Sequence, residues 1–455
     1  MAKAAENLLL VAALAAGGYF AWQRLKPLPA PAPPTAAQPP APTFDPPPAA
    51  PPPAPASEEP AAVPTIEQVA GIPEADVQTA RTLAERLSRR EPLFNADLRL
   101  AEDLFGRYPG EPRLRDLLEA TLVGLALQER MNRRFPEAAV RLQRAIEVHP
   151  EGPSARKGLV YVYLDAADWS AAEMAARAAL STSPRDPELL EALAYALFRQ
   201  DRNREALEAF RAVLEVADSP SAREHVARLE KNAQDESGMA EQRLSHFHVR
   251  YHGEEHADVG REILRALERH HASLTRALDH QPAETIAVIL FSREAYYSAS
   301  GAPRWSGGVF DHTDGRIRIP IGGLTSSLTP DIDDVVVHEL THAFVHDRSR
   351  GAAPREIHEG LAQWMEGKRI DAAYGPRELA ALADGRAGGV GAFYALALAF
   401  VEQLQSLRGQ GGLNDLLRLM GETGDVDAAF QSVYGDDFRG TQQRFLERLR
   451  QKYAS

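Results

Sequence analysis

Residues 333–342 read DDVVVHELTH, and this stretch decides how the C-terminal half of the chain is interpreted. The apolar run Val335–Val337 indicates a buried helix rather than a solvated one. His338 and His342 stand four positions apart, so they share one face of a helix, with Cα atoms about 6 Å apart along its axis. At that spacing both imidazoles can reach one metal ion. Glu339, between them, projects beside the same point.

The pattern HExxH on a helix is typical of zinc peptidases. Two imidazoles bind Zn2+ at about 2.0–2.1 Å, and zinc lowers the pKa of a bound water to about 7. Glu339 is therefore the expected general base, which takes a proton from that water. A surface helix with two solvated histidines is the alternative, and a third ligand distinguishes the two interpretations.

Residues 354–364 read PREIHEGLAQW, and their second glutamate is followed by a helical segment. HELTH followed by HEGLAQW resembles the gluzincin zinc peptidases, most closely their peptidase MA-like branch. The resemblance extends over residues 245–453. It implies a zincin-like metallopeptidase domain with Zn2+ as cofactor, in which His338 and His342 are the histidine ligands. It also implies that Glu359, supplied by a second helix, is the third ligand.

The sequence departs from the gluzincin pattern at the residue that is expected to hydrogen-bond to a histidine ligand. In the better-studied gluzincins an aspartate four residues after the ligand glutamate often supports a histidine, and here Gln363 stands there. An amide can accept a hydrogen bond but adds no negative charge, so a less basic ligand is expected. Arg348 stands where a metzincin carries its third histidine, which disfavours that class. His346 and His358 are expected to be bystanders, because helix geometry turns both away from the metal.

The group that stabilises the oxyanion is a separate question. Gluzincins often use a tyrosine or histidine from a later helix, and Tyr394 is our candidate because it begins an apolar helix that must pack near the site. Core packing beside Phe393 is the alternative reading of Tyr394. Tyr374 and the loop around His312 are further candidates.

The region 240–455 as a whole predicts an α+β fold, because strands come first and helices follow. Residues 258–278 predict a helix with a strand on either side. The predicted strands are 246–252, 284–291, 307–310 and 316–321. The last two are joined by an Asp-Gly turn, and their edge could pair with an extended substrate backbone.

Residues 65–235 are helix-forming and repeat with a period of 34 residues. Ala138, Ala172 and Ala206 keep this interval, and prolines recur at the same spacing between pairs of amphipathic helices. The pattern resembles the tetratricopeptide repeat, which implies an α-helical solenoid that binds a substrate or partner protein on its concave face. A platform that only supports the C-terminal domain is the alternative.

The N-terminus carries two further segments. Residues 1–26 contain an uncharged run, Leu8–Trp22, that predicts a membrane anchor helix, with a cleaved signal peptide as the alternative. Residues 27–64 hold seventeen prolines with alanine as the main filler, which predicts a disordered, extended Pro/Ala linker. We expect a membrane-anchored protein whose catalytic domain lies on the periplasmic or extracellular side.

Composition sets outer limits on this interpretation. A length of 455 residues predicts two or three units, and a formal charge of −13 argues against a nucleic-acid partner. The absence of cysteine excludes disulfides and thiolate metal sites. The sequence therefore predicts a zinc-dependent peptidase that hydrolyses peptide bonds with a metal-activated water. The alternative is a non-catalytic tetratricopeptide scaffold with a vestigial peptidase-like domain.

Overall fold

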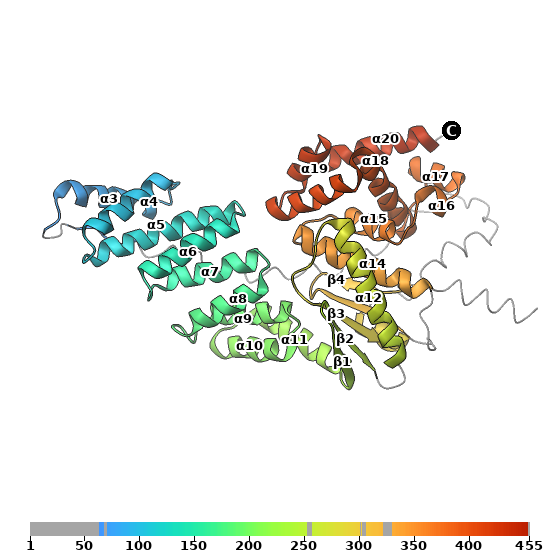
Figure 1. Ribbon diagram of the computed structural model, residues 1–455, viewed down its shortest axis with the longest axis horizontal. Helices are drawn as coiled ribbons and strands as arrows, with labels where there is room; N and C mark the ends of the chain where they lie inside the picture. The colour runs from blue at the N-terminus through green and yellow to red at the C-terminus, as the bar shows by residue number, and fades with distance from the viewer. Residues whose placement is uncertain are drawn as a thin grey trace, which may run out of the picture. The chain divides into compact units, whose positions relative to one another are not determined.

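The structure is a computed structural model that describes residues 63–67, 71–252, 257–300, 302, 306–321 and 330–453. The chain divides after Ala233 into a helical unit and a C-terminal unit, drawn in Figure 1. The expected anchor segment, residues 1–26, and most of the proline-rich linker lie outside the described residues. The membrane anchor and the disordered linker therefore stay predictions.

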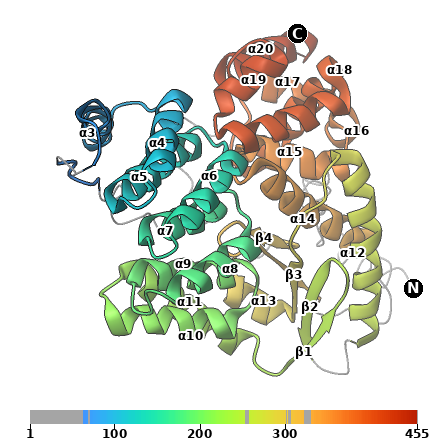
Figure 2. The same ribbon diagram turned by 60° about the vertical axis from the view of Figure 1, so that its left-hand side comes forward.

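The helical unit consists of helices that pack against one another in chain order (Figures 1 and 2). Three of them, α6, α8 and α10, begin at Phe135, Trp169 and Asn203, which are 34 residues apart. Prolines stand at the first turn of the alternate helices, where the missing N–H costs nothing. The bounds are α3 (Glu74–Ser88), α4 (Asn95–Arg107), α5 (Pro112–Met131), α6 (Phe135–Val148), α7 (Pro153–Asp165), α8 (Trp169–Leu180), α9 (Pro187–Arg199), α10 (Asn203–Val216) and α11 (Pro220–Asp235).

Small residues allow the close packing within these helix pairs. Ala138, Ala172 and Ala206, which carry the sequence period, are completely buried where α6, α8 and α10 meet their neighbours. The helical character and the 34-residue interval predicted from the sequence are thus present in the structure. That the unit is a tetratricopeptide solenoid with a protein-binding concave face remains a prediction.

The C-terminal unit contains a five-stranded mixed sheet within its described residues, in the order β1-β2-β3-β5-β4. The strands are β1 (Met239–Arg243), β2 (Phe247–His252), β3 (Ile286–Phe291), β4 (Val309–Asp311) and β5 (Arg316–Pro320). β2, β3 and β5 run parallel, whereas β1 and β4 pair antiparallel at the two edges. Every residue of β3 is buried, as expected for the centre of a sheet.

Helices surround this sheet and complete the α+β fold. α12 (Ala257–Leu278) connects β2 to β3 and packs against β2, beside the strands in Figure 2. The helices that follow β3 are α13 (Arg293–Ser300), α14 (Pro330–Ser349), α15 (Arg355–Met365), α16 (Ile370–Ala373), α17 (Pro376–Ala383), α18 (Val390–Thr423), α19 (Val426–Tyr434) and α20 (Phe438–Tyr453). The four strands and the first helix expected from the sequence are confirmed. β1 and α13 were not predicted, because neither has a clear apolar period.

The helix that carries HELTH is held on several sides. α14 packs against β4 and β5 as well as α12, α15 and α18. Its C-terminus is closed by Gly351, whose positive φ of 74° lets its N–H reach the carbonyl of His346 at 2.8 Å. Only five residues then separate α14 from α15. This short loop reverses the chain direction. It brings α15, which carries HEGLAQW, back against α14, which carries HELTH.

Gly360 sets the distance between α15 and α18. A Cβ atom at this position would overlap the carbonyl of Ala397 and the side chain of Val401, both in α18. The residue before Gly360 is Glu359, so the close approach of the two helices also positions that carboxylate. The position is therefore restricted to glycine by packing rather than by φ.

α18 is the one helix among the described residues that is long and apolar enough to cross a membrane. Its apolar side chains are instead part of the core of the C-terminal unit, including Leu398, Leu404 and Leu416. Gly409 interrupts its helical geometry with a φ of 65°. A core helix explains these features, and the expected N-terminal anchor lies outside the part of the chain that the structure describes.

Gly360→Ala should destabilise the C-terminal unit by about 1–3 kcal/mol, because the added methyl group forces α15 away from α18. Chemical denaturation would measure this change in the free energy of unfolding. Gly411→Ala is the matched control, since a Cβ at Gly411 in α18 meets nothing within 4 Å. The control should keep or slightly raise stability. Equal stability of Gly360→Ala and wild type would show that the two helices are not in close contact.

Candidate metal centre

His338 and His342 on α14 and Glu359 on α15 converge in the C-terminal unit. Oε2 of Glu359 lies 3.6 Å from Nε2 of His338 and 3.7 Å from Nε2 of His342. The three ligand atoms lie within 4.8 Å of one another. The structure thus brings together the three residues that the sequence analysis selected as ligands, and it does so from two helices joined by a short turn.

These distances fit a shared cation better than hydrogen bonds. Two donors on one tetrahedral zinc ion lie about 3.3–3.6 Å apart, given bond lengths of about 2.0–2.2 Å. A hydrogen bond between the same atoms would be shorter, about 2.7–3.2 Å. Oε2 of Glu359 is buried and has no hydrogen-bond partner among the described residues. A buried carboxylate oxygen left in this way is costly unless a cation binds it.

Electrostatics keep Glu359 ionised. Burial alone would raise the pKa of this carboxyl, but the neighbouring imidazoles of His342 and His338 lower it to about 2. The site therefore presents an ionised carboxylate to a cation bound between the two imidazoles. An oxygen and two imidazole nitrogens form a donor set that suits zinc.

Glu339 lies beside the triad in a buried position, 6% exposed. Burial raises its pKa to about 7, although a hydrogen bond from the backbone of Phe310 in β4 favours the charged form. A Cβ atom at Gly308 would lie only 2.8 Å from Cγ of Glu339. The segment that leads into β4 therefore packs directly on this carboxylate, which only a glycine permits. A carboxyl with a pKa near neutrality is suited to exchange a proton with water.

Glu366 supplies a carboxylate that the sequence analysis missed. It accepts a hydrogen bond from Nδ1 of His338 and forms an ion pair with Lys368. Together with Glu359 it raises the pKa of His338 to about 10, although burial opposes this. A hydrogen bond of this kind fixes the ring and leaves Nε2 as the ligand atom.

Gln363 does not take the place of the expected aspartate. Its Nε2 donates instead to the backbone carbonyls of Glu359, at 3.0 Å, and of Tyr394, at 2.9 Å. The expectation of a less basic histidine ligand was therefore wrong for His338, whose Nδ1 is hydrogen-bonded to the carboxylate of Glu366. Glu366 lies one turn beyond Gln363 and seven residues after Glu359, so a search along the same helix face could have found it. Nδ1 of His342 has no hydrogen-bond partner among the described residues.

Three further histidines surround His342. Nδ1 of His312 lies 3.4 Å from Nδ1 of His346, and the ring of His358 lies 4.8 Å from that of His312. Burial lowers the pKa of His312 and His358, so both rings are neutral at pH 7. No group of three ligand atoms among the described residues includes these histidines. That His346 and His358 are bystanders stays a prediction.

Tyr394 lies closer to the site than Tyr374 does. Burial raises the pKa of Tyr394, and the charges of Glu359 and Glu339 raise it further. Burial raises the pKa of Tyr374 to about 12. The charge that also raises it is that of Glu378, which is not part of the triad. The ring of His312 lies 6.3 Å from that of His342, so the His312 loop also borders the site. Tyr394 is the fifth residue of α18, and its role as the oxyanion donor stays a prediction.

A second group of possible metal ligands lies in the helical unit. Asp116, Glu119 and His149 have ligand atoms within 4.8 Å of one another. Nδ1 of His149 is already hydrogen-bonded to Glu119, and Gly152 leaves room for that carboxylate. A His–Glu pair that joins the end of α6 to α5 explains this group without a metal.

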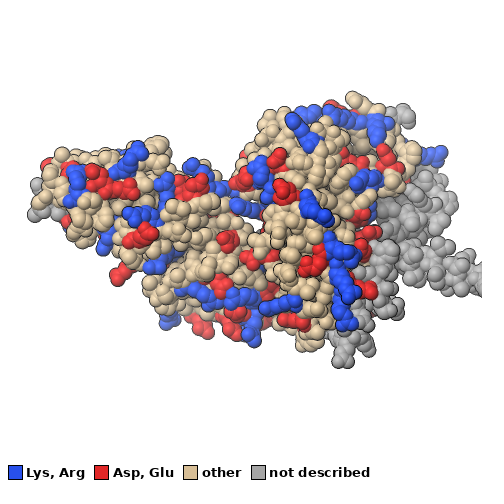
Figure 3. Space-filling view, viewed as in Figure 1, with Lys and Arg blue, Asp and Glu red and all other residues tan. Residues whose placement is uncertain are grey.

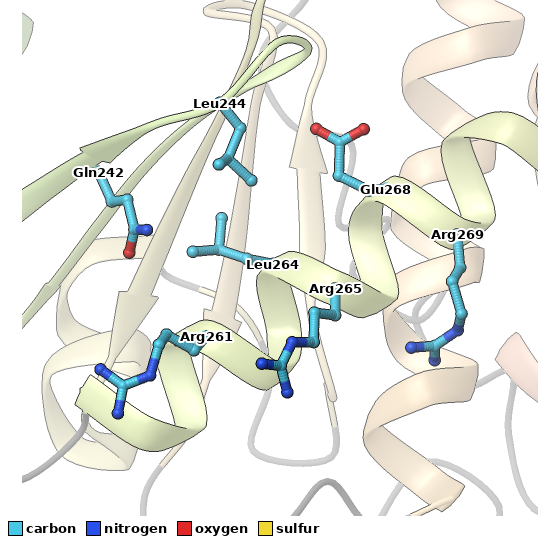
Figure 4. A pocket seen from close by; sticks show the side chains of 7 residues that line it. All are labelled: Gln242, Leu244, Arg261, Leu264, Arg265, Glu268 and Arg269. Atoms are coloured by element: carbon cyan, nitrogen blue, oxygen red, sulfur yellow. The ribbon is translucent and has the colours of Figure 1, made fainter.

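The C-terminal unit also has a hollow of about 770 Å3 between the β1–β2 hairpin and α12 (Figure 4). Its walls include Leu244 and Leu264, and it is bordered by Arg261, Arg265 and Arg269 from one side of α12. Basic side chains also gather along this helix in Figure 3. The hollow contains none of the triad, so it is separate from the candidate metal centre.

Comparison with known families agrees with the chemistry of the site. Residues 228–444 match the model of the BSP family, described as a peptidase of plants and bacteria. No curated protein matches the chain. The match includes the whole sheet, α14 and α15, and therefore every residue of the candidate centre. The C-terminal region is thus a peptidase-family domain, which supports peptidase activity.

Glu366→Gln should weaken the binding of Zn2+ to the triad by about 10- to 100-fold, because His338 loses a charged acceptor. Competition with a chromogenic chelator would measure the affinity. Glu356→Gln, on the same helix, is the matched control, since Glu356 accepts a hydrogen bond from Gln442 away from the site. Unchanged zinc affinity in Glu366→Gln would contradict the role of this carboxylate.

In the metal-free protein, Glu339→Gln should raise the free energy of unfolding at neutral pH. Because the pKa of Glu339 is raised from 4.5 to about 7, the folded state binds the proton more tightly than the unfolded chain. Stability is therefore lost as pH rises through this window. The Gln variant escapes this loss, so its advantage should be absent below pH 4.5 and reach on the order of 1–3 kcal/mol above pH 7. Denaturation curves at several pH values, with chelator present, would measure it. A variant less stable than wild type at pH 8 would contradict the raised pKa.

Proposed function

We propose that the protein is a zinc-dependent peptidase of the gluzincin type. The observation that carries this proposal is the convergence of His338, His342 and Glu359 around one point, with the buried carboxylate of Glu339 beside it. The match of this region to a peptidase family supports peptide bonds as the substrate. His338, His342 and Glu359 would hold the zinc ion.

The residues of the chain have separate roles in this proposal. Bound by the triad, zinc would supply the Lewis acidity for carbonyl polarisation and water activation. Glu339 takes the proton from the attacking water and later passes it to the leaving amine. Tyr394 donates a hydrogen bond to the developing oxyanion from the second turn of α18. Glu366 holds the ring of His338 in the orientation that keeps Nε2 available.

The edge of the sheet offers a place for an extended substrate. β4 is an edge strand, paired on one side with β5. Its backbone at Phe310 hydrogen-bonds to Glu339, and α14 packs against it. A peptide that pairs with the other side of β4 would therefore run past the carboxylate and the triad.

The alternative of a vestigial, non-catalytic domain loses one of its two arguments. It rested on the missing carboxylate behind the histidine ligands and on the helical repeats. Glu366 is hydrogen-bonded to His338 and so occupies the role of the missing group. The helical unit is compatible with either function, so the enzyme is the better proposal.

Glu339→Gln should keep one equivalent of zinc per chain but reduce turnover by about 10²–10⁴-fold, since only the proton transfer is removed. His342→Ala should lose both zinc and activity, because two ligands remain. Metal analysis and digestion of a diverse peptide mixture, followed by mass spectrometry, would measure the two effects. The Glu356→Gln variant should retain zinc and activity. Full activity in Glu339→Gln would refute the assignment of the base.

A further inference from the structure

Arg355 places a positive charge on the same face of α15 as the ligand Glu359. It is the first residue of α15 and precedes Glu359 by four positions, which is one helical turn. The residue is exposed, in contrast to the buried groups of the triad.

α18 holds the guanidinium in place. The guanidinium carbon of Arg355 lies 4.7 Å from the centre of the Phe393 ring. The next residue of α18 is Tyr394, whose side chain forms a hydrogen bond with Arg355. Stacking on an aromatic ring uses the face of the guanidinium, whereas its N–H donors lie in the plane, where they can bind an acceptor.

The charge of Arg355 acts on the groups that line the site. It is among the charges that lower the pKa of His342, Glu359 and His312. These residues belong to α14, α15 and the turn after β4.

We propose that Arg355 forms an anion subsite that binds a carboxylate of the substrate beside the scissile bond. This inference rests on the proposed peptidase function and names its substrate class: peptides with an acidic side chain, or a free C-terminal carboxylate, next to the cleaved bond. A planar guanidinium can bind either carboxylate with two hydrogen bonds. Both sources present the same chemistry to the site.

The test compares matched peptides with the zinc-loaded full chain. One series carries Glu or Gln at each position flanking the cleaved bond, and a second has a free or amidated C-terminus. We expect kcat/KM to be at least about tenfold higher for one carboxylate-bearing series, since a hydrogen bond to a charged group is typically worth this much. The series that shows the preference identifies the source of the carboxylate.

Variants then assign the preference to Arg355. Arg355→Gln should reduce the ratio of kcat/KM between charged and neutral peptides towards one, and Arg355→Glu should invert it in favour of a Lys-containing peptide. Arg377→Gln, which removes an exposed arginine from α17, is the control and should keep the ratio.

Three results would overturn the inference. Equal hydrolysis of charged and neutral peptides by wild type would remove the subsite but leave the peptidase proposal standing. A uniform loss of activity in Arg355→Gln, with the ratio unchanged, would show that Arg355 only positions Tyr394. Absence of hydrolysis of every peptide by the zinc-loaded protein would contradict the proposed function, and with it the subsite.

Discussion

The burial of three carboxylates around two imidazoles is the constraint on which the site depends. Glu339, Glu359 and Glu366 are largely removed from water, and each would be costly as an isolated charge. Glu366 is stabilised by His338 and Lys368. Oε2 of Glu359 has no hydrogen-bond partner among the described residues. A divalent cation between the imidazoles would resolve this imbalance, and the short turn between α14 and α15 leaves the three ligands little freedom to separate.

The surrounding fold serves to hold this arrangement. α14 is fixed by the sheet on one side and by α12 and α18 on others, while Gly360 and Gly308 allow α18 and the β4 segment to approach closely. A larger residue at Gly360 would force α15 and α18 apart, and one at Gly308 would force the β4 segment away from Glu339. The site is therefore built from rigid elements rather than loops, which suits a centre that must present fixed charges to a substrate.

Much of this could be predicted from the sequence because the signals are local. The i, i+4 spacing of His338 and His342, the apolar run of β3 and the 34-residue helical period all follow from neighbours in the chain. Glu359 was found through its family resemblance. Glu366 was missed because its partner, His338, lies on another helix, 28 residues away. Arg355 was missed for the same reason, since its significance depends on the ring of Phe393 in α18. β1 lacked an apolar alternation, so only its pairing with β2 reveals it.

X-ray absorption at the zinc edge of the metal-loaded protein would test the central claim most directly. The account predicts two imidazole nitrogens and oxygen ligands at about 2.0–2.2 Å in the wild type, and no protein-bound zinc signal from His342→Ala, which loses the ion. A spectrum of a fully hydrated ion without imidazole scattering, or one that does not change in His342→Ala, would contradict the assignment of His338, His342 and Glu359 as the metal ligands.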